Sequence, residues 1–199
     1  MTESATPPPE SWRRRARYLP NLLSLARLIV APITIWLILD GRLVSAFWMF
    51  SAAALTDAID GILARWLQAR TALGSYLDPI ADKMLLVGTY VALVWIGKLP
   101  AWLVVLVVAR DIGLILGVLA LHCVGRAAQS INPSLISKLN TVLQIALVVL
   151  VMAMAGIDVD ARNVIGTLVW IVAATTILSG IGYLRETIRQ FFSTTGAHA

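Results

Sequence analysis

Residues 57–82 read DAIDGILARWLQARTALGSYLDPIAD, and this stretch decides how the rest of the chain is interpreted. Aspartates recur along it, with glycines and arginines between them, inside a chain that is 59% hydrophobic and only 14% charged. An ionised carboxylate at membrane depth costs at least ~2.5–3.5 kcal/mol, so carboxylates in such surroundings are candidates for function. The stretch therefore predicts a functional site rather than apolar packing.

The composition of the whole chain predicts an integral membrane protein. A soluble domain has about 45–50% apolar and about 25% charged residues, well away from the values found here. The formal net charge of +5 indicates membrane orientation and attraction to anionic lipid, so no nucleic-acid partner is expected. The single cysteine, Cys123, cannot form an internal disulfide, and it forms no spaced zinc cluster with His122 or His198.

Six apolar runs, each near the ~20 residues that span the hydrocarbon core, predict transmembrane helices. The runs are continuously apolar without alternation, which favours helices over barrel strands. They cover residues 22–39, 43–66, 74–97, 100–123, 136–156 and 164–184. The sequence thus predicts an all-α integral membrane protein whose six transmembrane helices form one bundle.

The two ends of the chain differ from this apolar body. Residues 1–10 are polar and proline-rich, which predicts a disordered N-terminal tail. Residues 11–18, SWRRRARY, predict an interfacial amphipathic helix, although a simple positive-inside anchor explains them equally well. We expect one membrane domain over residues 11–190 and a C-terminal tail over residues 191–199.

The distribution of basic residues predicts the orientation of the bundle. If the N-terminus is cytoplasmic, the loops on the opposite side keep only Arg42, Lys98 and Arg162, and the other segments hold most of the basic residues. This bias favours cytoplasmic positions for both termini and for the aspartate stretch. A multi-pass protein of a bacterial-type inner (plasma) membrane is expected.

The aspartates are spaced so that they meet. Asp57 and Asp60 are three residues apart, and Asp78 and Asp82 are four apart, so each pair shares one helix face. The link between the two helices is short, which makes them antiparallel neighbours and lets the two pairs face each other. Four carboxylates at low dielectric repel one another strongly. Two divalent cations balance this charge, and oxygen ligands suit Mg²⁺, Mn²⁺ or Ca²⁺ better than zinc.

Small and basic residues between the aspartates fit a diphosphate ligand. Gly61 and Ala64 leave room for a ligand to approach the backbone, and Gly74 serves a turn or a similar close approach. Arg65 and Arg70 are suited to pairing with phosphate oxygens. Metal, small residues and cations together predict substitution at phosphorus.

The complete pattern is D-x2-D-G-x2-A-R-x8-G-x3-D-x3-D, and every position of it is filled. In this the chain resembles the CDP-alcohol phosphatidyltransferase family, whose architecture also has six helices and an N-terminal amphipathic segment. The resemblance implies transfer of a phosphatidyl or related group from a CDP-linked donor, CDP-diacylglycerol, to an alcohol, with release of CMP. It also implies two Mg²⁺ or Mn²⁺ ions and a homodimer.

The resemblance assigns roles to individual residues. Asp57, Asp60 and Asp78 would be metal ligands, and Asp82 would be both a ligand and the base that deprotonates the acceptor hydroxyl. A metal-bound carboxylate is a weaker base, so this role requires loose coordination of Asp82 or a metal-acidified hydroxyl. The residues implied in binding the CDP donor are Asn21, Ser24, Gly61, Ala64, Arg65, Thr71 and Gly74. Taken alone, Asn21 is equally suited to capping a helix.

Three basic residues outside the motif are candidates for binding the acceptor or its phosphate. Arg27 lies too deep in the first apolar run to reach the interface, so we expect it to face a polar cavity. Arg110 is followed by Asp111, which fits either a self-compensating buried pair or an anion-binding arginine. Lys138 fits an interfacial anchor or a contact to the acceptor phosphate.

Two subfamilies compete for the acceptor. The segments LSLARL, ARDI and SKLNT, the last followed by Gln144, resemble eukaryotic-type cardiolipin synthases, which use phosphatidylglycerol. Phosphatidylglycerophosphate synthases, which use glycerol-3-phosphate, share much of this and are the alternative. Both acceptors carry phosphate, so the basic residues do not separate them. An intramembrane prenyltransferase and an ion-coupled transporter also use buried carboxylates, but neither accounts for the whole motif.

Overall fold

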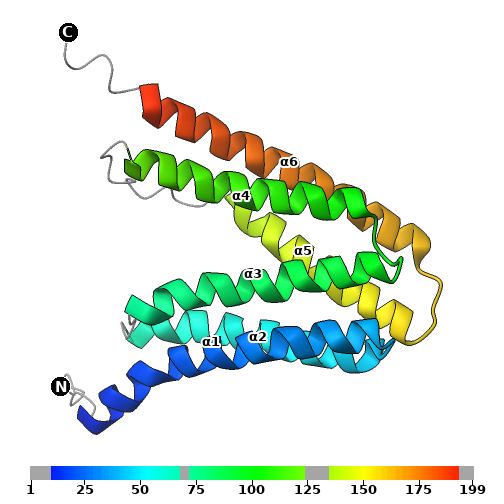
Figure 1. Ribbon diagram of the computed structural model, residues 1–199, viewed down its shortest axis with the longest axis horizontal. Coiled ribbons are helices and arrows are strands. Elements are labelled where there is room, and N and C mark those ends of the chain that lie inside the picture. Colours follow the sequence, from blue (N-terminus) through cyan, green and yellow to red (C-terminus); the bar gives the residue numbers. More distant parts are fainter. Residues whose placement is uncertain (1–9, 68–71, 124–134, 193–199) are drawn as a thin grey trace, which may run out of the picture. The chain divides into compact units, whose positions relative to one another are not determined.

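The computed structural model describes residues 10–67, 72–123 and 135–192, and the side chains within 25–57, 81–117 and 135–189. All regular elements in these ranges are helices (Figure 1). They are α1 (Glu10–Leu39), α2 (Leu43–Leu67), α3 (Ala72–Trp95), α4 (Ala101–Cys123), α5 (Leu135–Gly156) and α6 (Arg162–Phe192). The all-α prediction is confirmed for the described part of the chain.

The first and last helices are longer than the sequence indicated. Residues 11–18 and 22–39 were expected to form two helices, but α1 continues from Glu10 to Leu39 through both. No glycine separates the two segments, and the helix continues through Pro20 although an interior proline removes one backbone hydrogen bond and its ring crowds the preceding turn. The helix α6 extends to Phe192, into the expected C-terminal tail. The remaining tail positions, 1–9 and 193–199, lie outside the described residues.

Residues 1–92 and 93–199 form two compact units, and each is described by itself. In the N-terminal unit, α1 packs along α2 (Figure 1). Ile38 of α1 and Phe50 of α2 are among the buried residues of this unit. The α3 helix approaches α1 closely, because a Cβ atom at Gly88 would lie 2.5 Å from Ile35 Cδ1. Tight packing thus brings α3 next to α1 in this unit.

In the C-terminal unit, α6 packs against both α4 and α5 (Figure 1). Val107 of α4, Leu147 of α5 and Val172 of α6 are fully buried or nearly so. The central position of α6 allows its side chains to contact residues of both other helices. Polar residues of α6 can therefore bond to both neighbouring helices.

The helices α1, α3 and α5 end in the same way. In each, a residue with positive φ follows the helix, and the next backbone N–H bonds to a carbonyl five residues earlier, as in a Schellman motif. The residues with positive φ are Gly41 (77°), Gly97 (72°) and Asp158 (54°). The hydrogen bonds are Arg42 N to Leu37 O (2.9 Å), Lys98 N to Leu93 O (2.8 Å) and Val159 N to Met154 O (3.0 Å). These turns fix the positions of Lys98 and Asp158.

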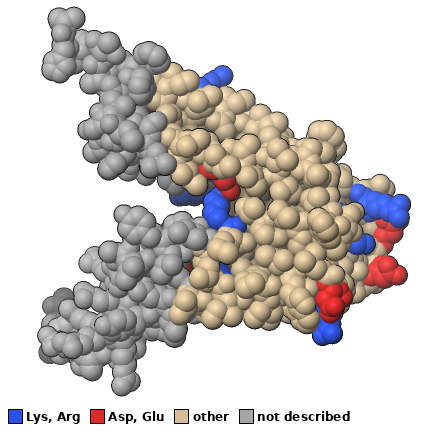
Figure 2. Space-filling view, in the orientation of Figure 1, with Lys and Arg blue, Asp and Glu red and all other residues tan. Residues whose placement is uncertain are grey.

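Much of the apolar surface faces outward. Among the described residues, two helical segments, Leu135–Gly156 and Arg162–Arg189, are long and apolar enough to cross a membrane, and only 33% and 28% of their apolar windows are buried. The core helix of a soluble protein is mostly buried instead. Val105 and Trp170 are 67% and 70% exposed, and uncharged residues cover most of the described surface in Figure 2. Such exposed apolar area favours contact with a membrane.

Gly117 of α4 lies against Tyr183 of α6, which leads to a prediction about stability. A Cβ atom at Gly117 would lie 2.7 Å from Cε1 of Tyr183, whose hydroxyl donates a hydrogen bond of 2.9 Å to the Leu114 carbonyl. We expect Gly117→Ala to destabilise the protein by about 1–3 kcal/mol because the tyrosine ring must move. Thermal unfolding in detergent, followed by tryptophan fluorescence, measures the effect.

Gly113→Ala is the matched control, because a Cβ atom there meets nothing within 4 Å. It should leave the unfolding temperature unchanged or raise it slightly, since alanine favours helix over glycine. Equal unfolding temperatures for the two variants would contradict the close contact at Gly117.

Candidate active site

Arg27 of α1, Asp57 of α2 and Asp82 of α3 meet in the N-terminal unit. The Arg27 side chain is only 6% exposed. Its Nη2 lies 2.6 Å from Asp57 Oδ1, and its Nη1 donates a hydrogen bond to Asp82 Oδ1. One guanidinium group therefore holds two carboxylates that come from different helices.

The charges of this trio explain its arrangement. A buried guanidinium is costly unless carboxylates pair with it, and two neighbouring carboxylates repel unless a cation lies between them. The planar fork of arginine can serve both carboxylates at once. The Asp57 and Asp82 side chains nevertheless remain 45% and 44% exposed. Part of each carboxylate thus stays accessible from outside the unit.

The spacing of the aspartates predicted that the two pairs would face each other; of the four, Asp57 and Asp82 have described side chains, and both pair with Arg27. The helix α2 continues through Asp60, and α3 contains Asp78 one turn before Asp82. The side chains of the other residues predicted to bind the metal ions or the donor lie outside the described ones. These residues are Asn21, Ser24, Asp60, Gly61, Ala64, Arg65, Thr71, Gly74 and Asp78.

The oxygen atoms at this point suit a hard divalent cation. Carboxylate oxygens are preferred ligands of Mg²⁺ and Mn²⁺, and Asp57 and Asp82 already converge on one positive charge. Within the described side chains, no group of three or more His, Cys, Asp or Glu residues is suited to holding a metal ion. Asp57 and Asp82 are paired with Arg27, so a cation bound there would share their charge with it. The metal-ligand role of the four aspartates stays a prediction.

A second buried arginine lies in the C-terminal unit. Arg110 of α4 and the adjacent Asp111 are each 7% exposed, and Arg110 Nη1 lies 2.9 Å from Asp111 Oδ1. Its Nη2 donates hydrogen bonds to Ser137 Oγ of α5 and, over 2.7 Å, to Ser179 Oγ of α6. Arg110 therefore joins all three helices of the unit. The ion pair expected of a self-compensating arrangement is present, together with two hydroxyl partners that the sequence did not reveal.

Polar contacts continue along the seam between α5 and α6. Asn140 Oδ1 accepts hydrogen bonds from Thr175 (2.8 Å) and Thr176 (2.9 Å). Two buried donors, Arg110 Nε and Asn140 Nδ2, have no protein acceptor among the described residues. A buried donor without a partner costs free energy, so an acceptor from a ligand or water is expected there. Lys138 is exposed in the first turn of α5, beside Ser137.

Sequence reasoning missed the polar residues of α6. Thr175, Thr176 and Ser179 are polar residues in an otherwise apolar run, and hydroxyl groups in such runs often bond to a neighbouring helix. That signal could have marked the face of α6 that meets α5. It could not have identified Arg110 and Asn140 as the partners, because those contacts join residues far apart in the chain.

Similarity to known proteins agrees with the motif. The family model described as CDP-alcohol phosphatidyltransferase matches residues 17–178. The chain is 34% identical over 193 residues to the rice (Oryza sativa subsp. japonica) chloroplastic CDP-diacylglycerol–glycerol-3-phosphate 3-phosphatidyltransferase 1, which covers 86% of this chain and 57% of the relative. It is 34% identical over 183 residues to human cardiolipin synthase (CMP-forming), covering 83% of this chain and 60% of the relative.

A bacterial relative is covered more completely. A protein of Mycobacterium tuberculosis named "Probable phosphatidylglycerophosphate synthase" is 32% identical over 186 residues, covering 89% of this chain and 85% of the relative. The chain spans less than two thirds of the length of the rice and human relatives. Because the matched region takes in most of the chain, including Arg27 and the whole aspartate motif, the chain belongs to the CDP-alcohol phosphatidyltransferase family.

Proposed function

We propose that the protein transfers a phosphatidyl group from CDP-diacylglycerol to an alcohol and releases CMP. The observation that carries this proposal is the convergence of Asp57 and Asp82 on Arg27 within the family's aspartate pattern. Family membership supports a donor linked to CDP. In this proposal the accessible carboxylates hold the diphosphate through its metal ions.

Two Mg²⁺ or Mn²⁺ ions are part of the proposal. Asp57, Asp60, Asp78 and Asp82 would hold them. When bound, they supply charge neutralisation and polarisation of the diphosphate. Beside them, a donor pocket would consist of Asn21, Ser24, Gly61, Ala64, Arg65, Thr71 and Gly74. We assign to Arg27 the role of keeping Asp57 and Asp82 together, in place of the acceptor contact suggested by its position in the sequence.

The catalytic step uses the accessible part of Asp82. Its ionised carboxylate takes the proton of the acceptor hydroxyl. The hydroxyl oxygen then forms a bond to the phosphatidyl phosphorus, while the bond from that phosphorus to the oxygen shared with CMP breaks. The exposure of the Asp82 side chain, 44%, leaves room for the acceptor to reach it.

For the acceptor we propose phosphatidylglycerol, which would make the protein a cardiolipin synthase. The ARDI and SKLNT segments support this choice, and the human relative bears that name. The alternative is glycerol-3-phosphate, supported by the rice and mycobacterial names. In either case Arg110 and Lys138 are proposed to bind the acceptor phosphate.

The proposed setting is a membrane. All six helices would cross it, with both termini and the aspartates on the cytoplasmic side of a bacterial-type inner membrane, and the protein would act as a homodimer. The exposed apolar surface of α5 and α6 supports membrane insertion, and the distribution of basic residues supports the orientation.

Purified protein incubated with Mg²⁺, CDP-diacylglycerol and one acceptor at a time tests the proposal. We expect CMP and cardiolipin with phosphatidylglycerol, and little product with glycerol-3-phosphate. Formation of phosphatidylglycerophosphate instead would establish the alternative acceptor. If no CMP were released with either acceptor, the proposed reaction would be contradicted.

Ser179→Ala tests whether Arg110 serves the acceptor. Removing the hydroxyl loosens the guanidinium, and a hydrogen bond of this kind contributes about 0.5–1.5 kcal/mol, so the acceptor KM should rise by roughly 2- to 10-fold. The KM for CDP-diacylglycerol should stay unchanged. Ser45→Ala, at an exposed position of α2, is the control. An equal rise in both KM values would indicate a purely structural role for Ser179.

A further inference from the structure

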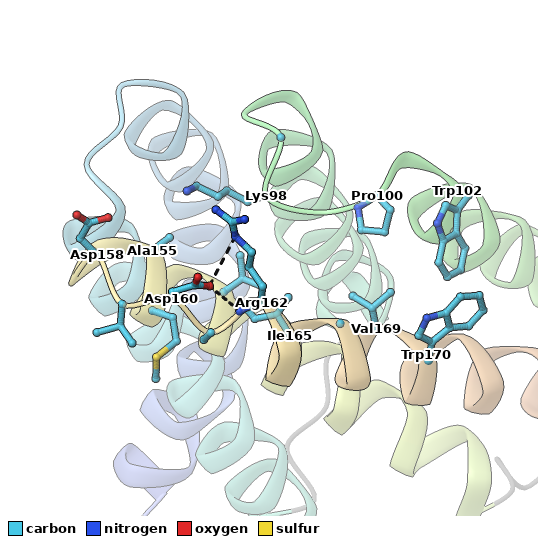
Figure 3. Close-up of a pocket in the computed structure, with 16 residues that line it drawn as sticks. Lys98, Pro100, Trp102, Ala155, Asp158, Asp160, Arg162, Ile165, Val169 and Trp170 are labelled. Atoms are coloured by element: carbon cyan, nitrogen blue, oxygen red, sulfur yellow. Dashed lines mark hydrogen bonds and ion pairs between the residues drawn. The ribbon is translucent and has the colours of Figure 1, made fainter.

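A cavity lined partly by charged residues and an apolar groove adjoin each other in the C-terminal unit, at the end where α4 and α6 begin (Figure 3). Their volumes are about 720 Å³ for the cavity and about 500 Å³ for the groove. Trp102 and Trp170 line both, and their ring centroids are 5.2 Å apart. The ring pair therefore marks the boundary between a polar and an apolar compartment of one site.

Two cations line the cavity. Lys98 and Arg162 both contribute to its lining, as Figure 3 shows. Asp160 is engaged locally, because its Oδ1 accepts the Arg162 backbone N–H (3.2 Å) and lies 3.6 Å from Arg162 Nε. Lys98 has no acidic partner among the described side chains. Two cations that line one cavity suit a phosphate group.

Asp158 supplies a separate negative charge at the same cavity. It is exposed, and the Schellman turn that ends α5 places it apart from Lys98 and Arg162 (Figure 3). Within the described part of the chain, no basic side chain pairs with it. A headgroup that carries both a phosphate and an ammonium group matches this distribution of charge better than a purely anionic one.

The groove has the form needed for an acyl chain. Each helix contributes a stripe with the spacing i, i+3, i+4, i+7, so each stripe is one helix face. The stripes are Trp102, Val105, Leu106 and Ala109 on α4, and Trp170, Ala173, Ala174 and Ile177 on α6. The alanines leave space between the helices, and tryptophans commonly lie at headgroup level at a membrane interface.

We propose that the cavity and groove bind one zwitterionic glycerophospholipid. Its phosphate lies between Lys98 and Arg162, its ammonium group contacts Asp158, and an acyl chain follows the groove between α4 and α6. Such a lipid is neither the donor nor the acceptor of the proposed reaction. The loops concerned are those that the distribution of basic residues places on the non-cytoplasmic side.

Native mass spectrometry of the full chain in detergent, with phosphatidylethanolamine as the probe, tests this site. We expect Lys98→Gln/Arg162→Gln to retain about tenfold less of this lipid, because hydrogen bonds to charged groups contribute about 1.5–3 kcal/mol. Ala174→Phe, which fills the groove, should also reduce retention. Arg42→Gln removes a cation that is paired with Asp40 instead, and it should retain the lipid as the wild type does.

Diacylglycerol, which lacks the phosphate and the ammonium group, should be retained poorly by all of these proteins. Equal retention of diacylglycerol and phosphatidylethanolamine, or wild-type retention by the double variant, would overturn the proposal. Unchanged retention by Ala174→Phe would overturn it as well. The measurement requires no transfer activity, so its outcome is independent of the proposed reaction.

Discussion

Asp82→Asn is expected to lower the transfer rate by about 10²–10⁴-fold, the range typical of losing a general base. The asparagine has nearly the same size and can still accept a hydrogen bond from Arg27, so α1 and α3 should stay together. It cannot accept the proton of the acceptor hydroxyl, and it is a poor metal ligand. Initial rates of CMP release at saturating donor and acceptor measure the effect.

The matched control is Asp40→Asn. Asp40 is also partly exposed and paired with an arginine, since its Oδ2 lies 2.7 Å from Arg42 Nε. It is not part of the proposed site, and its replacement should leave the rate near that of the wild type. If Asp82→Asn were as active as Asp40→Asn, the proposed role of Asp82 would be wrong.

Arg27→Gln is expected to make the stability of the protein depend on divalent cations. Breaking a buried ion pair costs about 3–5 kcal/mol, and the lower end applies here because Asp57 and Asp82 are nearly half exposed. Without the guanidinium, the two carboxylates repel each other unless a metal ion neutralises them. The unfolding temperature in a chelator should therefore fall well below that of the wild type, and Mg²⁺ should restore much of the difference.

The comparison requires a second arginine variant. Arg42 is 61% exposed, so Arg42→Gln should unfold at the wild-type temperature both with a chelator and with Mg²⁺. If Mg²⁺ raised the unfolding temperature of Arg27→Gln no more than that of Arg42→Gln, Arg27 would not be the group that balances Asp57 and Asp82.

Local patterns were sufficient to predict the helices and part of the site. The continuous apolar runs identified all six helices, and the short link between two of them indicated that Asp57 and Asp82 would meet, as the structure shows. Both features depend on residues close together in sequence or on helix periodicity. The helix face shared by each aspartate pair and the short connection between the two helices can be recognised without tertiary information.

The partners of the buried arginines could not be predicted in the same way. Arg27 was expected to face a polar cavity, and its pairing with two carboxylates of other helices was not anticipated. Arg110 was expected to pair with Asp111 or to bind an anion, and the hydroxyls of Ser137 and Ser179 were not anticipated. Such contacts depend on which helices pack together and on their rotation, and neither is encoded in a local pattern.

The binding of Mn²⁺ to purified protein in detergent, followed by electron paramagnetic resonance, tests the central claim of an acidic metal site shared by α2 and α3. We predict two bound ions per chain in the wild type and loss of this binding in Asp57→Asn/Asp82→Asn, while Asp40→Asn binds as the wild type does. Undiminished Mn²⁺ binding in the double variant would contradict the claim.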